Sequence, residues 1–330
     1  DDALLLGIDA DHEPRHIAEV DDRQVEGVGE IDEVLELDAR VRRHRATEVA
    51  TIVADHRDRE AIDAASGTGT HLAELELVSP ITTPCRVVAQ LLNYRSHAID
   101  AGSDPKTLQP TFFRKSSASI SGPNDPIRQP PEVALLDYEI ELGVVVGADI
   151  PIGTTVTDDN LSAYVAGFVV ANDVSAREIQ LTKVQVYESK SYPTFTPLGP
   201  RLVLLDNDEL RRLPELHMTL AVNGETRQDQ TIGNDLITPP ADALTRLARF
   251  QNMTAGDVLL TGTPIGTAIS APSKVIQKIG ELIPPDLKWK FFFARQAKNP
   301  KYLSVDDVVT ATIRTADGSI DLGTQETVVR

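Results

Sequence analysis

The sequence predicts an α+β protein that is rich in β-strand, and two observations carry this prediction. Short runs of β-branched and other apolar residues, divided by Gly, Pro, Asn and Asp, dominate the chain after about residue 80. These runs do not alternate regularly with helical segments, which argues against a doubly wound parallel sheet. We therefore expect one large, mostly β domain with a few helices.

A second, smaller domain is expected at the N-terminus. Residues 1–78 combine a hairpin-like apolar pattern with charged helical stretches, which is typical of a small α/β unit. Pro80 and Pro84 mark a linker or strand edge at its end. Residues 79–330 form the larger predicted domain.

Patterning places the secondary structure of the larger domain. Asn223-Gly224 predicts a tight hairpin turn between two strands. A helix is predicted over residues 240–250, because its apolar residues fall on one face. The predicted strands are Val87–Leu92, Ser119–Ile120, Leu135–Val146, Tyr164–Ala171, Arg201–Leu205, His217–Val222, Val258–Thr261 and Val308–Ile313.

Composition restricts the partners and the compartment. The net charge of −18 disfavours nucleic acid and anionic membranes, since both attract basic surfaces. Cys85 is the single cysteine, so no intrachain disulfide can form, and a cytoplasmic location is expected. The sequence has no run of 18 apolar residues and no recognisable signal peptide.

Two glutamates lie on the predicted strand Leu136–Gly147. Glu139 and Glu141 are two residues apart, so a strand places both on one face, roughly 6–7 Å apart at their Cα atoms. A solvated outer face would explain this pattern, and so would a shared divalent cation. Asp173 follows another buried-looking strand and is either a helix N-cap or a third ligand. Three carboxylates predict Mg²⁺ or Mn²⁺, with Ca²⁺ as a further candidate.

Three further stretches carry candidate chemistry. His97 and Asp100 are three residues apart, a spacing that suits a water-activating pair but also occurs on surface helices. Lys190 lies in a stretch bounded by Ser and Pro, and is either a held cation or a solvated loop residue. The glycines of residues 260–266 could let backbone N–H groups approach an anionic ligand.

Taken in order, these motifs resemble the fumarylacetoacetate hydrolase family. The resemblance covers about residues 80–266 and resumes at Tyr302. The matching residues are Asn93-Tyr94-x-x-His97, Phe112-Phe113-x-Lys115, Gly122-Pro123, Asp137-Tyr138-Glu139-x-Glu141-Leu142, Asn172-Asp173-x-Ser175-x-Arg177, Lys190-Ser191 with Pro197-Leu198-Gly199-Pro200, Asn223-Gly224, Gly256-Asp257 and Thr261-Gly262-Thr263-Pro264-x-Gly266.

The resemblance implies a fold, an assembly and a set of site residues. The fold would be a mixed β-sandwich roll over residues 79–330, in a homodimer. The metal would be held by Glu139, Glu141 and Asp173. His97 would activate water with Asp100, although the family usually has Glu as the acidic partner, and Lys190 would polarise the substrate carbonyl. The expected substrate-binding residues are Tyr94, Lys115, Arg177, Gln180 and Thr263.

The expected activity is hydrolysis of a C–C bond in a β-diketone or acylpyruvate, of the kind met in the breakdown of aromatic compounds. A metal-stabilised enolate equally serves a 2-oxo acid decarboxylase, dehydratase or keto–enol isomerase, and these alternatives stay open. A metal-stabilised binding protein with an inactive site is the non-enzymatic alternative.

Residues 269–302 depart from the family pattern as an insertion. Their sequence predicts two short helices with an aromatic, basic face. The segment is either a packing or dimer-contact insertion or a cap that shapes the substrate pocket.

Overall fold

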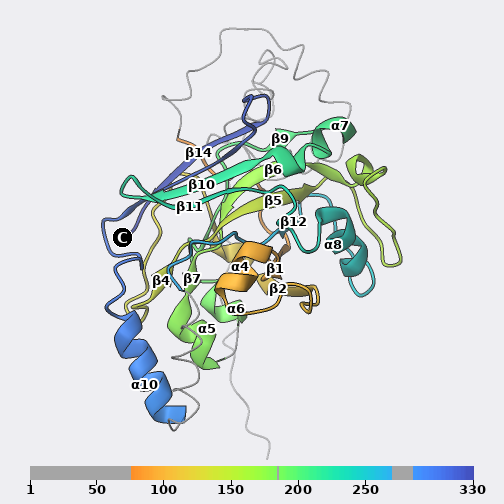
Figure 1. The fold of residues 1–330 in the computed structure, drawn as a ribbon. Helices are drawn as coiled ribbons and strands as arrows, with labels where there is room; N and C mark the ends of the chain where they lie inside the picture. The colour runs from red at the N-terminus through yellow and green to blue at the C-terminus, as the bar shows by residue number, and fades with distance from the viewer. Residues whose placement is uncertain (1–75, 184–185, 270–284) are drawn as a thin grey trace, which may run out of the picture.

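A computed structural model describes residues 76–183, 186–269 and 285–330 (Figure 1). The predicted N-terminal domain falls almost entirely outside these residues, as does the first of the two helices predicted in the insertion. Within the described part the protein is α+β and strand-rich, so the predicted fold class is confirmed. No helix among these residues has both the length and the apolar character to cross a membrane.

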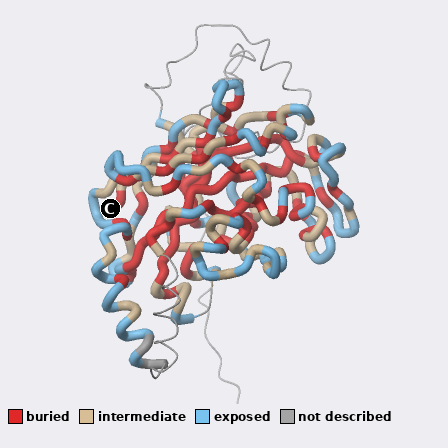
Figure 2. The backbone as a smooth tube through the Cα atoms, in the orientation of Figure 1, coloured by how far each residue is buried: buried red, intermediate tan, exposed pale blue. Residues whose placement is uncertain are grey.

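The larger sheet has six strands, and β5 and β6 lie toward one side of its centre. All neighbouring strands are antiparallel except the parallel pair β1 and β12. In spatial order the strands are β2 (Thr111–Lys115), β1 (Val87–Leu91), β12 (Val258–Leu260), β5 (Ile140–Val146), β6 (Val165–Asn172) and β9 (Val203–Leu204). Every residue of β5 and β6 is buried, which explains their continuous apolar sequence (Figure 2).

The smaller sheet has four antiparallel strands. In spatial order they are β11 (Glu225–Thr231), β10 (His217–Val222), β13 (Val308–Arg314) and β14 (Asp321–Val328). The predicted hairpin joins β10 to β11, and both Asn223 and Gly224 have positive φ, as a type I′ turn requires. On β10 buried and half-buried residues alternate, so one face of this sheet is apolar.

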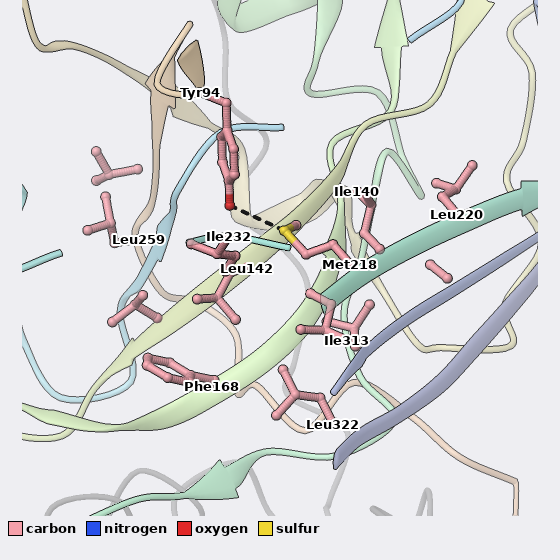
Figure 3. Close-up of a cluster of buried hydrophobic side chains, with 14 of the residues drawn as sticks. Tyr94, Ile140, Leu142, Phe168, Met218, Leu220, Ile232, Leu259, Ile313 and Leu322 are labelled. Atoms are coloured by element: carbon pink, nitrogen blue, oxygen red, sulfur yellow. Dashed lines mark hydrogen bonds between the residues drawn. The ribbon is translucent and has the colours of Figure 1, made fainter. Parts of the chain in front are cut away.

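The main core lies between the two sheets. Apolar residues of β5 and β6 pack there against those of β10, β13 and β14 (Figure 3). A second apolar cluster covers the opposite face of the larger sheet and includes Val87, Val145 and Val169. The strands that lead into the candidate site are therefore fixed on both faces.

Short elements complete the described fold. The small two-stranded sheets pair β3 (Ile120–Ser121) with β8 (Thr196–Pro197) and β4 (Leu136–Asp137) with β7 (Ser175–Ala176). The helices are α4 (Arg95–Asp100), α5 (Arg177–Lys183), α6 (Val186–Ser189), α7 (Asn207–Leu210), α8 (Pro240–Leu247) and α10 (Pro285–Gln296), with short 3-10 turns at Ser117–Ser119, Leu161–Ala163 and Leu213–Glu215. Helix α10 extends away from the two sheets (Figure 1).

One predicted strand proves to be two. The strand expected over residues 135–146 is interrupted at Tyr138 and Glu139, between β4 and β5. The N–H groups of these two residues donate to side chains, Tyr138 to Asp137 Oδ1 and Glu139 to Asn172 Oδ1, instead of to a neighbouring strand. The interruption brings Asp137 and Glu139 into the candidate site.

Candidate metal centre and active site

Three buried carboxylates meet where β5 begins and β6 ends. Glu139 precedes β5, Glu141 lies on it and Asp173 follows β6, where the register pairs Ile140 with Asn172. Carboxylate oxygens of the three acids all lie within 4.8 Å of one another. The sheet register thus brings together the three acids that the sequence proposed as ligands.

Three cationic side chains surround these acids. Lys190 Nζ donates to Glu139 Oε2 at 2.7 Å and to Asp173 Oδ2 at 2.5 Å. Lys115, at the end of β2, donates to the other oxygen of Asp173 and to the carbonyl of Phe195. Arg177, at the start of α5, donates from Nη2 to Glu139 Oε1. Glu139 and Asp173 therefore each pair with two cations.

Glu141 has a different environment. In the described part of the chain its one hydrogen bond comes from the backbone N–H of Gly262, at 2.8 Å from Oε2. Burial, and the neighbouring charges of Asp173 and Glu139, raise the pKa of Glu141 well above its ordinary range. A carboxylate this buried, without a cationic partner, is unfavourable in its charged form.

Opposite shifts act on the neighbouring groups. Burial alone would raise the pKa of Glu139, but Lys190 and Arg177 outweigh it, and that pKa falls below its usual range. Burial lowers the pKa of Lys115, whereas Asp173 and Glu139 outweigh burial at Lys190 and raise its pKa. The cluster therefore holds Glu139 as a carboxylate and Lys190 as an ammonium.

The donor set fits a hard divalent cation. Glu139, Glu141 and Asp173 offer only oxygen, and in the described ranges no cysteine or histidine joins this group. Of the three acids, Glu141 is the one that contacts no side-chain cation in the described part of the chain. A bound divalent cation would be its cationic partner.

Asp137, to which the sequence analysis assigned no role, lies beside this cluster. Its carboxylate is fully buried and accepts from Arg177 Nε at 2.8 Å. Arg177 in turn donates from Nη1 to Gln180 Oε1 at 2.8 Å. Two of the expected substrate-binding residues, Arg177 and Gln180, are thus linked to the acid cluster. The feature of the sequence that could have indicated Asp137 is that residues 137–141 contain a third acid beside Glu139 and Glu141.

His97 and Asp100 both lie on α4, but no hydrogen bond joins them in the described structure. His97 Nδ1 is buried without a hydrogen-bond partner there. Burial lowers the pKa of His97 from its ordinary value of 6.5, and Glu139 affects it more strongly than Asp100 does. The imidazole is therefore neutral near pH 7.

Two other expected contact residues have structural partners. Tyr94 is fully buried among core side chains, and its hydroxyl donates to Met218 Sδ at 3.2 Å (Figure 3). Thr263 Oγ1 accepts from Gln228 Nε2 at 2.8 Å. Gln228, which the sequence analysis missed, also accepts from the N–H of Ile140 and so ties β11 to the start of β5.

Comparison with known protein families agrees with the resemblance that the sequence motifs indicated. The family model for the fumarylacetoacetate (FAA) hydrolase C-terminal region matches residues 86–330. The chain belongs to this family. The recognition made from the sequence motifs is thereby confirmed.

Individual relatives carry tautomerase and isomerase names. The chain is 36% identical over 211 residues to the oxaloacetate tautomerase Fahd2a, mitochondrial, of Rattus norvegicus, covering 63% of this chain and 65% of that protein. It is 34% identical over 198 residues to the oxaloacetate tautomerase YisK of Bacillus subtilis, covering 59% and 64%. The match thus spans less than two thirds of each curated relative.

A solved structure shows the same fold. The 5-carboxymethyl-2-hydroxymuconate delta-isomerase of Mycobacterium smegmatis is similar with a TM-score of 0.59 and 26% identity, covering 80% of this chain and 85% of that one. The expected assignment as a hydrolase of C–C bonds is wrong, because these relatives are named tautomerases and isomerases. The isomerase alternative fits the findings better than the hydrolase.

Proposed function

We propose that this protein is a metal-dependent keto–enol isomerase that acts on a small 2-oxo dicarboxylic acid, with oxaloacetate as the first candidate. One observation carries the proposal: a buried cluster combines three carboxylates within 4.8 Å of one another with Lys115, Arg177 and Lys190. Such a cluster suits a metal and an anionic enolate. The names of the relatives supply the reaction class.

The charges of the cluster suit a dianion. Its acids are Asp137, Glu139, Glu141 and Asp173, and its bases are Lys115, Arg177 and Lys190. With all four acids ionised the cluster carries one negative charge, and a divalent cation would make it positive by one. Glu139, Glu141 and Asp173 would hold Mg²⁺ or Mn²⁺, which when bound would polarise the oxo group as a Lewis acid.

Arg177 is the candidate carboxylate binder. A guanidinium has five N–H groups, and the described contacts of Arg177 use three of them, to Asp137, Glu139 and Gln180. One N–H on each terminal nitrogen remains for a substrate carboxylate. Arginine binds carboxylates through such paired N–H groups.

His97 is the candidate proton carrier. Its neutral imidazole has a free Nδ1, which can take a proton from the carbon beside the oxo group and return it. Lys190 is held as an ammonium and stabilises the negative charge that develops on the oxo oxygen. In the keto-to-enol direction this oxygen receives the proton that His97 took from carbon, and in the reverse direction His97 takes the proton from the enol oxygen and gives it to carbon. The missing hydrogen bond between His97 and Asp100 supports proton transfer to carbon over activation of water.

The test is direct. Wild-type protein with Mg²⁺ or Mn²⁺ should accelerate loss of the enol absorbance of oxaloacetate, and NMR should show oxaloacetate conserved with faster exchange of its C3 protons for deuterium. Chelation with EDTA should abolish the acceleration, and added metal should restore it. Formation of pyruvate would indicate a decarboxylase instead. Unchanged equilibration with either metal would refute the proposal.

Two expectations accompany the proposal without bearing on the chemistry. A homodimer is predicted, and light scattering of the purified chain would measure it. A cytoplasmic location stays a prediction from the single cysteine, Cys85.

A further inference from the structure

The carboxylate of Asp137 collects four N–H donors. Its Oδ1 accepts from the backbone N–H groups of Tyr138 and Ala268, each at 2.8 Å. Its Oδ2 accepts from Arg177 Nε at 2.8 Å and from the N–H of Ile269 at 3.1 Å. Asp137 is fully buried, so these donors, together with the charge of Arg177, must stabilise its ionised form.

The strand β4 that carries Asp137 also anchors both ends of the inserted segment. Ala268 and Ile269, at its start, donate to the Asp137 side chain, and Leu303, just after it, donates to the Leu136 carbonyl at 2.8 Å. Asn299 Nδ2 donates to the Ala268 carbonyl at 2.9 Å and links the two ends directly. Asp137 therefore contacts both the base of the insertion and the acid cluster.

We infer that Asp137 is a positioning residue that fixes the guanidinium of Arg177 for substrate binding. The inference deepens the proposed function and rests on it. Three acceptors, Asp137, Glu139 and Gln180, define the plane of the guanidinium. Without the Asp137 charge, Arg177 remains held by Glu139 but loses the contact at Nε that sets its orientation.

The Asp137→Asn variant tests this inference. The amide keeps an oxygen for the backbone donors but loses the charge that pairs with Arg177. We expect oxalate, a planar dianion that imitates an enolate, to bind roughly 10-fold more weakly in the presence of Mg²⁺, as for other groups that orient a ligand-binding residue. Calorimetry measures this binding. With oxaloacetate, KM should rise by a similar factor while kcat changes less than about twofold.

Two further variants separate positioning from a structural role. In an Arg177→Met background, Asp137→Asn should change oxalate affinity by less than about twofold, because the arginine through which it acts is absent. Asn299→Ala removes a contact at the base of the insertion but leaves Asp137 and Arg177 paired, so it should leave oxalate affinity unchanged. Circular dichroism of each variant verifies folding.

Opposite results would overturn the inference. Unchanged oxalate affinity in Asp137→Asn, independent effects of Asp137 and Arg177, or equal weakening by Asn299→Ala would each reject it. A wild-type protein that binds no oxalate would reject it as well. If wild-type protein binds oxalate but does not interconvert oxaloacetate, the proposed function fails while the positioning role of Asp137 is still decided by the binding data.

Discussion

Glu141 differs from the other two acids of the cluster in having no cationic partner among the described residues. Glu139 and Asp173 each contact two side-chain cations, whereas Glu141 accepts one bond from the N–H of Gly262. A bound divalent cation would therefore stabilise the charged form of Glu141 more than that of the other two acids. Glu141 is for this reason the most informative ligand to substitute.

We predict that Glu141→Gln weakens Mg²⁺ or Mn²⁺ binding at least about 100-fold, since even outer partners of metal ligands are worth 10- to 100-fold. The amide keeps the volume and the Gly262 contact but removes the charge. Calorimetric titration with each metal measures the change. Glu326→Gln is the matched control, because Glu326 lies exposed on β14 and should leave the affinity as it is. Equal affinities in wild type and Glu141→Gln would remove this residue from the ligand set.

His97 gives a prediction in pH. Burial, aided by Arg177 and Lys190 and opposed by Glu139 and Asp100, lowers the pKa of His97 below 6.5. The neutral imidazole is the active base, so kcat/KM for oxaloacetate should stay level as the pH falls to 6.5 and should decrease only below it. His97→Gln should lose at least about 100-fold in kcat/KM and should also lose this acid limb. A limb centred above 6.5, or one retained in the variant, contradicts the assignment.

At the residue scale, local spacing predicted which acids lie close together in the candidate site but not all the hydrogen bonds that these residues make. The three carboxylates lie together because Glu139 and Glu141 are two residues apart and Asp173 directly follows the adjacent strand, β6. The partners of Asp137 at Ala268 and Ile269 are 131 and 132 residues away, so no local pattern could assign them. The three-residue spacing of His97 and Asp100 allowed a contact on α4 but did not produce a hydrogen bond, because spacing does not fix side-chain rotamers.

At the element scale, close approach of β6 to its neighbours depends on a glycine. A Cβ built on Gly167 would lie 1.8 Å from the carbonyl oxygen of Val203 on β9. Gly167→Ala must therefore separate β6 from β9 or distort both. We predict a loss of more than about 3 kcal/mol in the free energy of unfolding, beyond the usual cost of overpacking.

Gly153→Ala is the matched control for that loss. Gly153 has a φ of +91° and no atom within 4 Å of a built Cβ, so alanine there meets only backbone strain of about 1 kcal/mol. Urea denaturation of both variants, analysed with a common slope, compares them. A loss in Gly167→Ala no larger than that in Gly153→Ala would show that β9 gives way without cost.

At this scale the sequence could not predict where side chains accept hydrogen bonds from backbone N–H groups and so interrupt a strand. Apolar continuity predicted β5 and β6 correctly, but it extended the first strand through Tyr138 and Glu139. The strand breaks there because Asp137 and Asn172 take the N–H groups of these residues. The helix expected to reach residue 250 ends at Leu247. Ala243, Leu244 and Leu247 are buried as its predicted apolar face requires, whereas Phe250, beyond the helix end, is exposed.

At the scale of the whole molecule, the candidate site joins elements that are distant in the chain. Lys115 ends β2, Asp173 follows β6, and Gly262 follows β12. A cation bound by the three acids would therefore stabilise the packing of most of the larger sheet and not only one loop. A ligand that binds only the folded state raises the free energy of unfolding with its concentration.

This linkage predicts metal-dependent stability even without a substrate. At a free Mg²⁺ concentration of 100 times Kd, the free energy of unfolding should rise by about 2.7 kcal/mol, which shifts Tm by several degrees in a domain of this size. Thermal unfolding followed by circular dichroism over a Mg²⁺ series measures the shift. Glu141→Gln should abolish it at the same concentrations, and Glu326→Gln should retain it. A shift of equal size in both variants would place the cation elsewhere on this acidic protein, whose net charge of −18 attracts cations non-specifically.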